Sequence, residues 1–197
     1  SEPEAGENLI TTLDGGLQKK AYALLAGRKG ALVAGDPASG EILALVSSPG
    51  FKPNAIEQYL NDQNLPLFNR AISGVYPPGS TFKLVTAAAA LEENKIDAAG
   101  EIEDTGVINI GPYSYSNWYF TQYGRTEGRL NIVGAIKRSN DIFFYRLGEA
   151  LGIRALSDWA KFFGLGKATG IDLPGEAAGV MPEPEWKQTV RKEDWFL

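Results

Sequence analysis

The chain has 197 residues, of which 44% are hydrophobic and 22% charged, so we expect one packed domain of ordinary size and no general disorder. Its 19 basic and 24 acidic residues give a net charge of −5, a balance that does not suggest a nucleic-acid partner. The chain has no cysteine and no histidine, which excludes disulfides, thiol nucleophiles, Cys- or His-ligated metal sites and a Ser-His-Asp triad. Any serine chemistry must therefore use Lys, Asp or Glu as its base.

The N-terminal part of the chain predicts a small sheet. Residues 8–13 fit a short strand, and residues 17–25 fit an amphipathic helix. Two apolar runs, 30–34 and 42–46, are joined by the turn formers of 36–40 and predict a β-hairpin. Because both runs are apolar throughout, we expect both faces of the hairpin to be covered.

The stretch from Tyr76 to Glu92 predicts a stiff turn followed by a buried helix. Pro77-Pro78-Gly79 fix the turn, and the Ala/Leu-rich run after Lys83 has high helix propensity. Ser80 then lies at the helix start, about one turn from Lys83 on nearly the same face. A lysine amine can activate a serine hydroxyl, and a helix N-terminus can stabilise an oxyanion. Serine is also a favoured N-cap residue, so an ordinary capped helix stays an alternative here.

The rest of the chain alternates irregular and helical segments. Residues 47–73 have few periodic signals beyond one helical turn at 56–60. Residues 101–129 are polar and aromatic, and we expect an irregular surface excursion that either lines a groove or packs under a long loop. Helical periodicity returns at Leu130, and a further helix fits 154–163 before the glycine at position 164.

Ser139-Asn140-Asp141 lies at the predicted junction of two helices. Taken alone, it fits an N-cap followed by an acidic residue in the first turn. Together with Ser80 and Lys83, its hydroxyl and carboxylate also fit a proton relay to a leaving amine.

These motifs, in this order, resemble the class B penicillin-binding proteins, and the Ser-x-Asp form of the second motif resembles their elongation type, penicillin-binding protein 2. The resemblance covers nearly the whole chain. The segments that carry it are Ala31 to Pro49, Tyr76 to Lys83, Ser139 to Tyr145, Phe163 to Gly166, Thr169 to Glu176 and Pro182 to Trp186.

The resemblance implies a serine-type D,D-transpeptidase that cross-links peptidoglycan through an acyl-enzyme on Ser80 and is inhibited by β-lactams. Lys83 would be the base, and the Ser80 N–H would form half of the oxyanion hole. Ser139 and Asp141 would help to hold Lys83 and to pass a proton to the departing D-Ala.

The resemblance further implies three substrate-binding residues, Gly79, Trp118 and Asn140, with no metal and no cofactor. The implied partners are peptidoglycan stem peptides, β-lactam antibiotics and possible cell-elongation membrane proteins. The implied location is the periplasmic face of the cytoplasmic membrane, with an anchor in the full-length protein.

The implied fold is α+β and β-lactamase/transpeptidase-like, with an incomplete antiparallel sheet (about 8–47), an all-helical lobe (about 48–164) and a tail (165–197). No Lys-Thr-Gly or Lys-Ser-Gly follows Asp141, and Gly124 to Gly128 replaces a histidine-containing patch of the family. We therefore expect the N-terminal half of a transpeptidase domain, without the Lys-Thr-Gly half, the pedestal or the membrane anchor. Such a fragment would be inactive unless a second chain supplied the rest.

Two alternative functions stay open. A serine β-lactamase or β-lactam sensor domain shares Ser-x-x-Lys but is less expected to carry the segment from Gly170 to Glu176. A non-catalytic cell-wall scaffold module would keep the fold without the chemistry.

Overall fold

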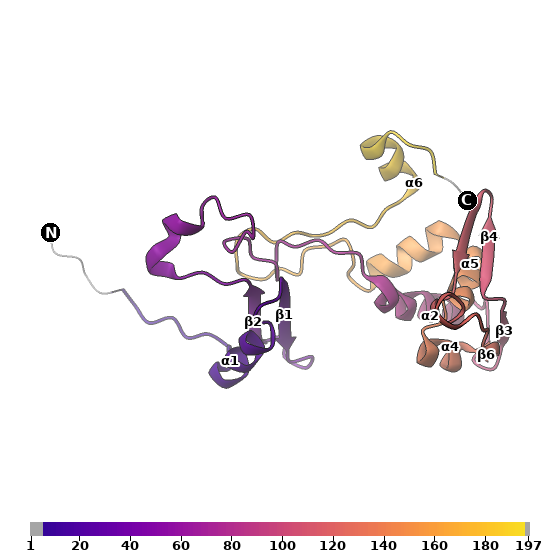
Figure 1. Ribbon diagram of the computed structural model, residues 1–197, viewed down its shortest axis with the longest axis horizontal. Coiled ribbons are helices and arrows are strands. Elements are labelled where there is room, and N and C mark those ends of the chain that lie inside the picture. Colours follow the sequence, from indigo (N-terminus) through magenta and orange to yellow (C-terminus); the bar gives the residue numbers. More distant parts are fainter. Residues whose placement is uncertain (1–5, 196–197) are drawn as a thin grey trace. The chain divides into compact units, whose positions relative to one another are not determined.

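The computed structural model describes residues 6–195, which fall into two compact units (Figure 1). One unit comprises the described residues up to Val75 together with Asp172–Ala177, and the other comprises Tyr76–Ile171 and the residues from Ala178 onward. Each unit combines helices with antiparallel strands, which confirms the predicted mixture of helix and sheet.

The predicted hairpin in the first unit is confirmed. β1 (Gly30–Gly35) pairs antiparallel with β2 (Ile42–Ser48). The Asp36 carboxylate accepts a hydrogen bond from the Ala38 N–H at 2.9 Å, which is the local bond that makes aspartate a good turn former.

α1 (Gly15–Leu24) covers one face of this hairpin. Ala21 of α1 is buried against Ala44 and Val46 of β2. On β1, burial alternates along the strand, and Val33 is 49% exposed. Within the described residues, therefore, the expectation that both faces are covered is wrong, because α1 packs on one face only.

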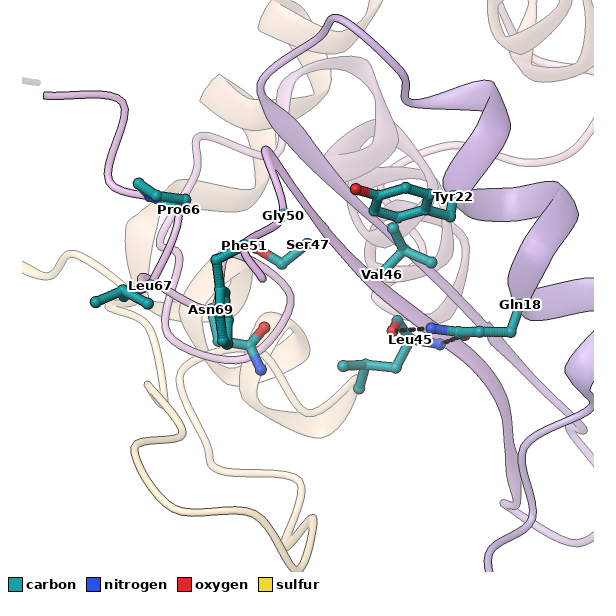
Figure 2. Close-up of a pocket in the computed structure, with 10 residues that line it drawn as sticks. All are labelled: Gln18, Tyr22, Leu45, Val46, Ser47, Gly50, Phe51, Pro66, Leu67 and Asn69. Carbon is teal, nitrogen blue, oxygen red and sulfur yellow. Dashed lines mark hydrogen bonds between the residues drawn. The ribbon is translucent and has the colours of Figure 1, made fainter. Parts of the chain in front are cut away.

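The edge of β2 is closed by a side chain of α1. The Gln18 amide donates to the Leu45 carbonyl at 2.8 Å and accepts from the Leu45 N–H at 2.9 Å, as Figure 2 shows. A primary amide carries both a donor and an acceptor, so it can take the place of a neighbouring strand at this one residue.

The predicted strand over residues 8–13 is wrong. A strand needs a ladder of backbone hydrogen bonds to a partner strand, and none pairs with these residues in the part of the chain that the structure describes. Leu9 and Ile10 are 88% and 94% exposed. The segment meets β2 through the Thr12 hydroxyl, which donates to the Ile42 carbonyl at 2.6 Å.

Residues 49–75 contain a 3₁₀ helix at Pro53–Tyr59, where we predicted one helical turn. The Ser47 hydroxyl holds the following stretch, accepting from the Arg70 N–H at 3.0 Å. The segment Asp172–Ala177 joins the same unit through the Ala177 N–H, which donates to the Ile72 carbonyl at 2.8 Å.

The core of the second unit lies between two helices, α2 (Lys83–Glu92) and α5 (Asp141–Phe162). α2 supplies small buried side chains, among them Ala87 and Ala90, which let the two helices approach closely. α5 fills the interface with large buried side chains, namely Phe143, Phe144 and Leu147. The predicted buried central helix is therefore confirmed.

The segment that we expected to be irregular is ordered, and the expected all-helical lobe also contains strands. β3 (Glu101–Asp104) pairs with β6 (Gly128–Asn131), β4 (Val107–Ile110) pairs with β5 (Tyr113–Ser116), and α3 (Trp118–Tyr123) follows β5. Strands of four residues are too short to show a clear alternation of apolar and polar positions, which is why the sequence pattern missed them.

The two helices predicted around Ser139-Asn140-Asp141 are confirmed. α4 (Ile132–Arg138) ends and α5 begins at this tripeptide. α5 is interrupted at Gly152, whose φ of 74° and ψ of 165° are not helical, so its second half matches the helix predicted at 154–163.

The tail carries a short helix, α6 (Pro184–Trp186), and a π-helical turn at Lys187–Arg191. Glu183 ties the tail to α5 by accepting hydrogen bonds from the Ser157 hydroxyl and the Lys161 ammonium. Across the residues that the structure describes, no helix is both long and apolar enough to cross a membrane.

Candidate active site

Ser80 lies in a 3₁₀ turn, Gly79–Phe82, that leads into α2. The Lys83 N–H donates to the Ser80 carbonyl, which is the i to i+3 bond of a 3₁₀ helix. Side chains three residues apart eclipse each other in such a turn, so this local geometry brings the Ser80 and Lys83 side chains to the same side. Ser80 is exposed, as a nucleophile must be to meet a substrate.

The Lys83 side chain is only 14% exposed, and its ammonium is fully engaged. It donates to the Asp141 carboxylate at 2.6 Å, to the Ser139 carbonyl at 2.7 Å and to the Ser139 hydroxyl at 3.2 Å. An ammonium has three donors, so these contacts account for all of them. Phe144 of α5 lies beneath it, with the nitrogen 5.7 Å from the ring centroid.

Ser139 connects the lysine to the candidate nucleophile. Its hydroxyl donates to the Ser80 hydroxyl at 3.0 Å and accepts from Lys83. Ser139 adopts a left-handed conformation, with φ of 51° and ψ of 41°, at the C-terminus of α4. This uncommon backbone geometry turns its carbonyl toward the same lysine, so one residue supplies two of the three acceptors.

Asp141 occupies the first position of α5, where a carboxylate is favoured by the helix dipole. One carboxylate oxygen accepts from Lys83, and the other accepts from the Trp118 N–H at 3.3 Å. Its side chain is 24% exposed. The structure therefore brings Ser80, Lys83, Ser139 and Asp141, which the sequence analysis selected, into one continuous set of contacts.

The three predicted substrate-binding residues are placed differently from one another. Gly79 is exposed and has a φ of 56°, a conformation that glycine adopts without strain. Trp118 is 38% exposed at the start of α3, and its indole N–H donates to the Arg138 carbonyl at 2.9 Å. Asn140 is completely buried and caps α5, accepting from the Phe143 N–H at 2.9 Å.

The aromatic segment after β5 forms an exposed hollow with two arginines. The Arg138 guanidinium carbon lies 5.4 Å from the Trp118 ring centroid and 5.2 Å from that of Tyr119. With Tyr123 and Arg125, these residues line a cavity of about 530 Å³. Of the two possibilities for the aromatic segment, lining a surface hollow is therefore the one realised at these residues.

Four residues that the sequence analysis did not select support the site: Asp104, Asn117, Glu127 and Arg138. Three of them, Asp104, Asn117 and Glu127, belong to the segment that we expected to be irregular, and Arg138 lies just before the predicted helix junction, so no local pattern indicated that these residues would support the site. One local signal was available, because Asp104-Thr105-Gly106 fits a turn in which an aspartate caps the backbone two residues on.

Tyr145 lies one turn after Asp141 on α5, with its ring 5.7 Å from that of Tyr115. Burial, the Asp141 carboxylate and Tyr115, in that order, raise the pKa of Tyr145 above its usual 10.0. Tyr145 therefore presents a neutral phenol near Asp141 at physiological pH. Among residues 6–195, no group of three or more acidic side chains is arranged to hold a metal ion.

A second hollow lies in the first unit, apart from these residues in sequence. It has a volume of about 360 Å³, and Figure 2 shows the Tyr22 ring, Phe51 and Asn69 around it, with Gln18 and Leu45 bonded to each other. None of the sequence-predicted site residues lines it.

Comparison with known proteins identifies a family and several relatives. The family described as "Penicillin binding protein transpeptidase domain" matches residues 30–193. A curated relative, peptidoglycan D,D-transpeptidase MrdA of Acinetobacter baumannii, is 42% identical over 99% of this chain and 30% of its own length. The chain thus spans about a third of the length of the curated relatives it matches.

Solved structures agree with the sequence comparisons. PBP2 of Pseudomonas aeruginosa, solved in complex with WCK 5153, matches with a TM-score of 0.84 and 37% identity, over 94% of this chain and 44% of that one. PBP2 of Helicobacter pylori, solved in complex with MreC, matches with a TM-score of 0.83 and 31% identity, over 93% of this chain and 36% of that one. These similarities confirm the predicted penicillin-recognising fold.

Proposed function

The chain belongs to the penicillin-binding protein transpeptidase domain family, and on that premise we propose that it serves in a serine D,D-transpeptidase that cross-links peptidoglycan. The activity is assigned to the protein at the length of these relatives, called the full-length form below. One observation carries the proposal: the exposed Ser80 hydroxyl is linked through Ser139 to Lys83, which Asp141 holds from the opposite side.

In the first step, the Ser80 oxygen bonds to the carbonyl carbon of the D-Ala-D-Ala peptide bond. The step requires Lys83 to have released one of the three protons that it donates in the structure; it then accepts the Ser80 proton, and the Ser139 hydroxyl lies between the two groups. The resulting ammonium is stabilised by the Asp141 carboxylate at 2.6 Å. Backbone N–H groups in the first turn of a helix lack intrahelical partners, so the Ser80 N–H is available to the oxyanion.

In the second step, the carbon–nitrogen bond to the terminal D-Ala breaks, and its nitrogen takes the Ser139 proton. The Lys83 ammonium then gives a proton to the Ser139 oxygen, which returns the lysine to its free-amine form. An amine of a second stem peptide then attacks the Ser80 ester. The carbon–oxygen bond breaks, and the proton lost by the amine returns to the Ser80 oxygen.

β-Lactams enter the same first step, because their ring amide opens when Ser80 attacks it. The ring nitrogen stays tethered to the acyl group, so nothing departs and the ester persists. Slow release of this ester distinguishes a transpeptidase from a serine β-lactamase, which would hydrolyse it rapidly, and from a non-catalytic scaffold module, which would not form it.

We also assign this activity to the outside of the cytoplasm, where peptidoglycan is built, and to assembly with elongation-type membrane proteins. Support comes from the MrdA-type relatives and from the H. pylori PBP2 structure, which is a complex with MreC. Co-purification of the full-length form with the MreC homologue of the same organism tests the second assignment.

The chemistry is tested by labelling the full-length form with a fluorescent penicillin. We expect a stable covalent label on the wild type and none on Ser80→Ala. Ser73→Ala is the matched control, since Ser73 lies seven residues before Ser80 and its hydroxyl donates to the Gly175 carbonyl in the first unit. Label that survives Ser80→Ala would refute the proposal.

A further inference from the structure

A polar cluster with a buried centre connects β3 and α3 to the candidate active site. Its anchor is Asp104, the last residue of β3, which is 2% exposed. The Asp104 carboxylate accepts from the Gly106 N–H at 2.8 Å, from the Asn117 amide at 3.0 Å and from the Glu127 N–H at 3.0 Å. A buried carboxylate is tolerated only when hydrogen bonds compensate for its lost hydration, and here three do.

Asn117 bridges this anchor to α5. It is completely buried, and it is the N-cap residue of α3. Asparagine at an N-cap usually bonds its own helix, but the Asn117 side chain makes no such bond to α3. Its nitrogen donates to Asp104, and its oxygen accepts from the Asp141 N–H at 3.2 Å. The side chain therefore connects β3 to the first residue of α5 and leaves α3 without a side-chain cap.

The next residue, Trp118, holds the same aspartate from its other end. The Trp118 N–H donates to the Asp141 carboxylate oxygen that does not face Lys83. Asp141 is thus held at its backbone by Asn117 and at its side chain by Trp118, two consecutive residues of one chain segment.

A parallel contact fixes Asn140. The Asn140 amide donates to Glu127 at 3.3 Å, and the other Glu127 oxygen accepts from Arg138. The Glu127 backbone is itself bonded to Asp104, so both supports share one anchor. Among the described residues, every buried polar side-chain atom has a hydrogen-bond partner, so loss of one member leaves another unsatisfied.

We propose that Asn117 is a positioning residue for the acylation step, and that it acts by holding Asp141 against Lys83 from a buried site anchored on Asp104. The Asn117 side chain bonds Asp104 and the Asp141 N–H, and in the described part of the chain it has no hydrogen bond to Ser80 or Lys83, so we assign its effect to Asp141. This inference rests on the proposed function, because its readout is acylation of Ser80.

The test measures the acylation rate constant of the full-length form with a penicillin, separately from noncovalent binding. Because misplacement of a reacting group by about 1 Å can cost about 100-fold, we expect Asn117→Ala to slow acylation by about 10- to 100-fold. Binding before acylation should change by less than about twofold, since Asn117 is buried away from ligand. Asn109→Ala, at an exposed asparagine on β4, is the matched control and should behave as the wild type.

A double-mutant cycle separates positioning from general damage to the fold. In an Asp141→Asn background, Asn117→Ala should slow acylation much less than in the wild type, because the ion pair that it positions is already absent. An equal loss in both backgrounds, or an unchanged rate for Asn117→Ala in the wild type, would overturn the proposal.

Asn117→Asp covers the case in which Asn117→Ala does not fold. The new carboxylate can still accept from the Asp141 N–H. It can form a hydrogen bond with the Asp104 carboxylate only when one of the two groups carries a proton. The charged groups around it are Asp104 on β3, Asp141 on α5 with its partner Lys83, and Glu127 with its partner Arg138. Its acylation rate relative to the wild type should rise as pH falls from 8 to 6, and a flat ratio would overturn the proposal.

The outcomes also separate this inference from the function on which it rests. A wild-type full-length form that takes no label at Ser80 refutes the proposed function. A wild type that is labelled normally, with Asn117 variants that acylate at the wild-type rate, refutes only the positioning role.

Discussion

Ser139 combines an uncommon backbone conformation with contacts to both Ser80 and Lys83. A left-handed backbone costs a non-glycine residue about 1–2 kcal/mol, and the helix junction between α4 and α5 sustains it. A glycine would remove that cost but also the hydroxyl. At this position, therefore, glycine would favour stability, whereas serine would favour activity.

We predict that Ser139→Ala and Ser139→Gly both slow acylation of Ser80 by about 100-fold or more, the size expected when a proton-transfer group is lost. Ser139→Gly should melt at a higher temperature than Ser139→Ala, because only glycine relieves the left-handed backbone. Thermal denaturation and penicillin acylation of the same samples give both results. Ser114→Ala, at an exposed serine of β5, should change neither. Normal acylation by Ser139→Gly would contradict the role of the hydroxyl.

Short sequence motifs were enough to predict the site residues that lie near one another in the chain. Ser80 and Lys83 are neighbours on one turn, and Ser139 and Asp141 belong to a recognisable tripeptide. Asn117 was not predictable in this way, because its partners lie on two other elements, at positions 104 and 141. The sequence indicated that this tripeptide could cap a helix, as Asn140 does, but it did not show that Asn140 would be completely buried and not exposed to a ligand.

At the scale of elements, the site depends on how closely α2 approaches α5. The alanines of α2 are buried against the aromatic residues of α5, and Lys83 leads into this interface. Any side chain that separates the two helices also moves Lys83 away from Asp141. A substitution that disturbs the packing of α2 against α5 should therefore also weaken the contact between Lys83 and Asp141.

We predict that Ala90→Leu lowers the free energy of unfolding by about 1–3 kcal/mol, because Ala90 is 0% exposed and extra methyl groups overpack the interface. Acylation should slow as well, since the helices separate. Ala98→Leu, in the exposed turn after α2, is the control and should change neither quantity. Denaturation in urea measures the first effect, and an unchanged midpoint for Ala90→Leu would show that the interface is loose.

An ion pair between Lys161 of α5 and Glu183 holds the tail to α5, and its contribution to stability depends on pH. Hydrogen bonds from Lys161 and then Ser157 lower the pKa of Glu183 below its usual 4.5, and the hydrogen bond to Glu183 raises the pKa of Lys161 above its usual 10.5. The contribution of Glu183 is complete above pH 4.5 and is lost as pH falls through its lowered pKa. The contribution of Lys161 is complete below pH 10.5 and is lost as pH rises through its raised pKa.

We therefore predict that hydrogen-exchange protection at the tail helix falls when pH is lowered from 7 to 3, after correction for the intrinsic exchange rate. Lys161→Met should abolish most of that change by removing the charge partner of Glu183. Protection that stays constant between pH 7 and pH 3 in the wild type would show that the pair does not hold the tail.

Element prediction succeeded where segments were long or bounded by strong turn residues, as in the hairpin and in α2 and α5. It failed for β3 to β6, whose four residues each give no periodic signal, and for residues 8–13, which have no partner strand among the described residues. Pairing between distant segments is a tertiary property, and local patterns carry little information about it.

At the scale of the whole molecule, the family assignment and the geometry of the second unit agree. The candidate catalytic residues lie within that unit: Ser80 in the 3₁₀ turn before α2, Lys83 on α2, Ser139 at the α4–α5 junction and Asp141 on α5. The chain spans about a third of the length of its curated relatives, so the proposed reaction is assigned to the full-length form. The motifs, in their order along the chain, resemble this family, and the match of the family model to residues 30–193 confirms that prediction.

The central claim is that Ser80 is a nucleophile activated by Ser139, Lys83 and Asp141. The most direct measurement is peptide mapping by mass spectrometry after reaction of the full-length form with benzylpenicillin. We expect the tryptic peptide ending at Lys83 to gain the mass of one intact benzylpenicillin, with fragmentation placing it on Ser80. An adduct on any other residue, or no adduct on a folded wild-type protein, would contradict it.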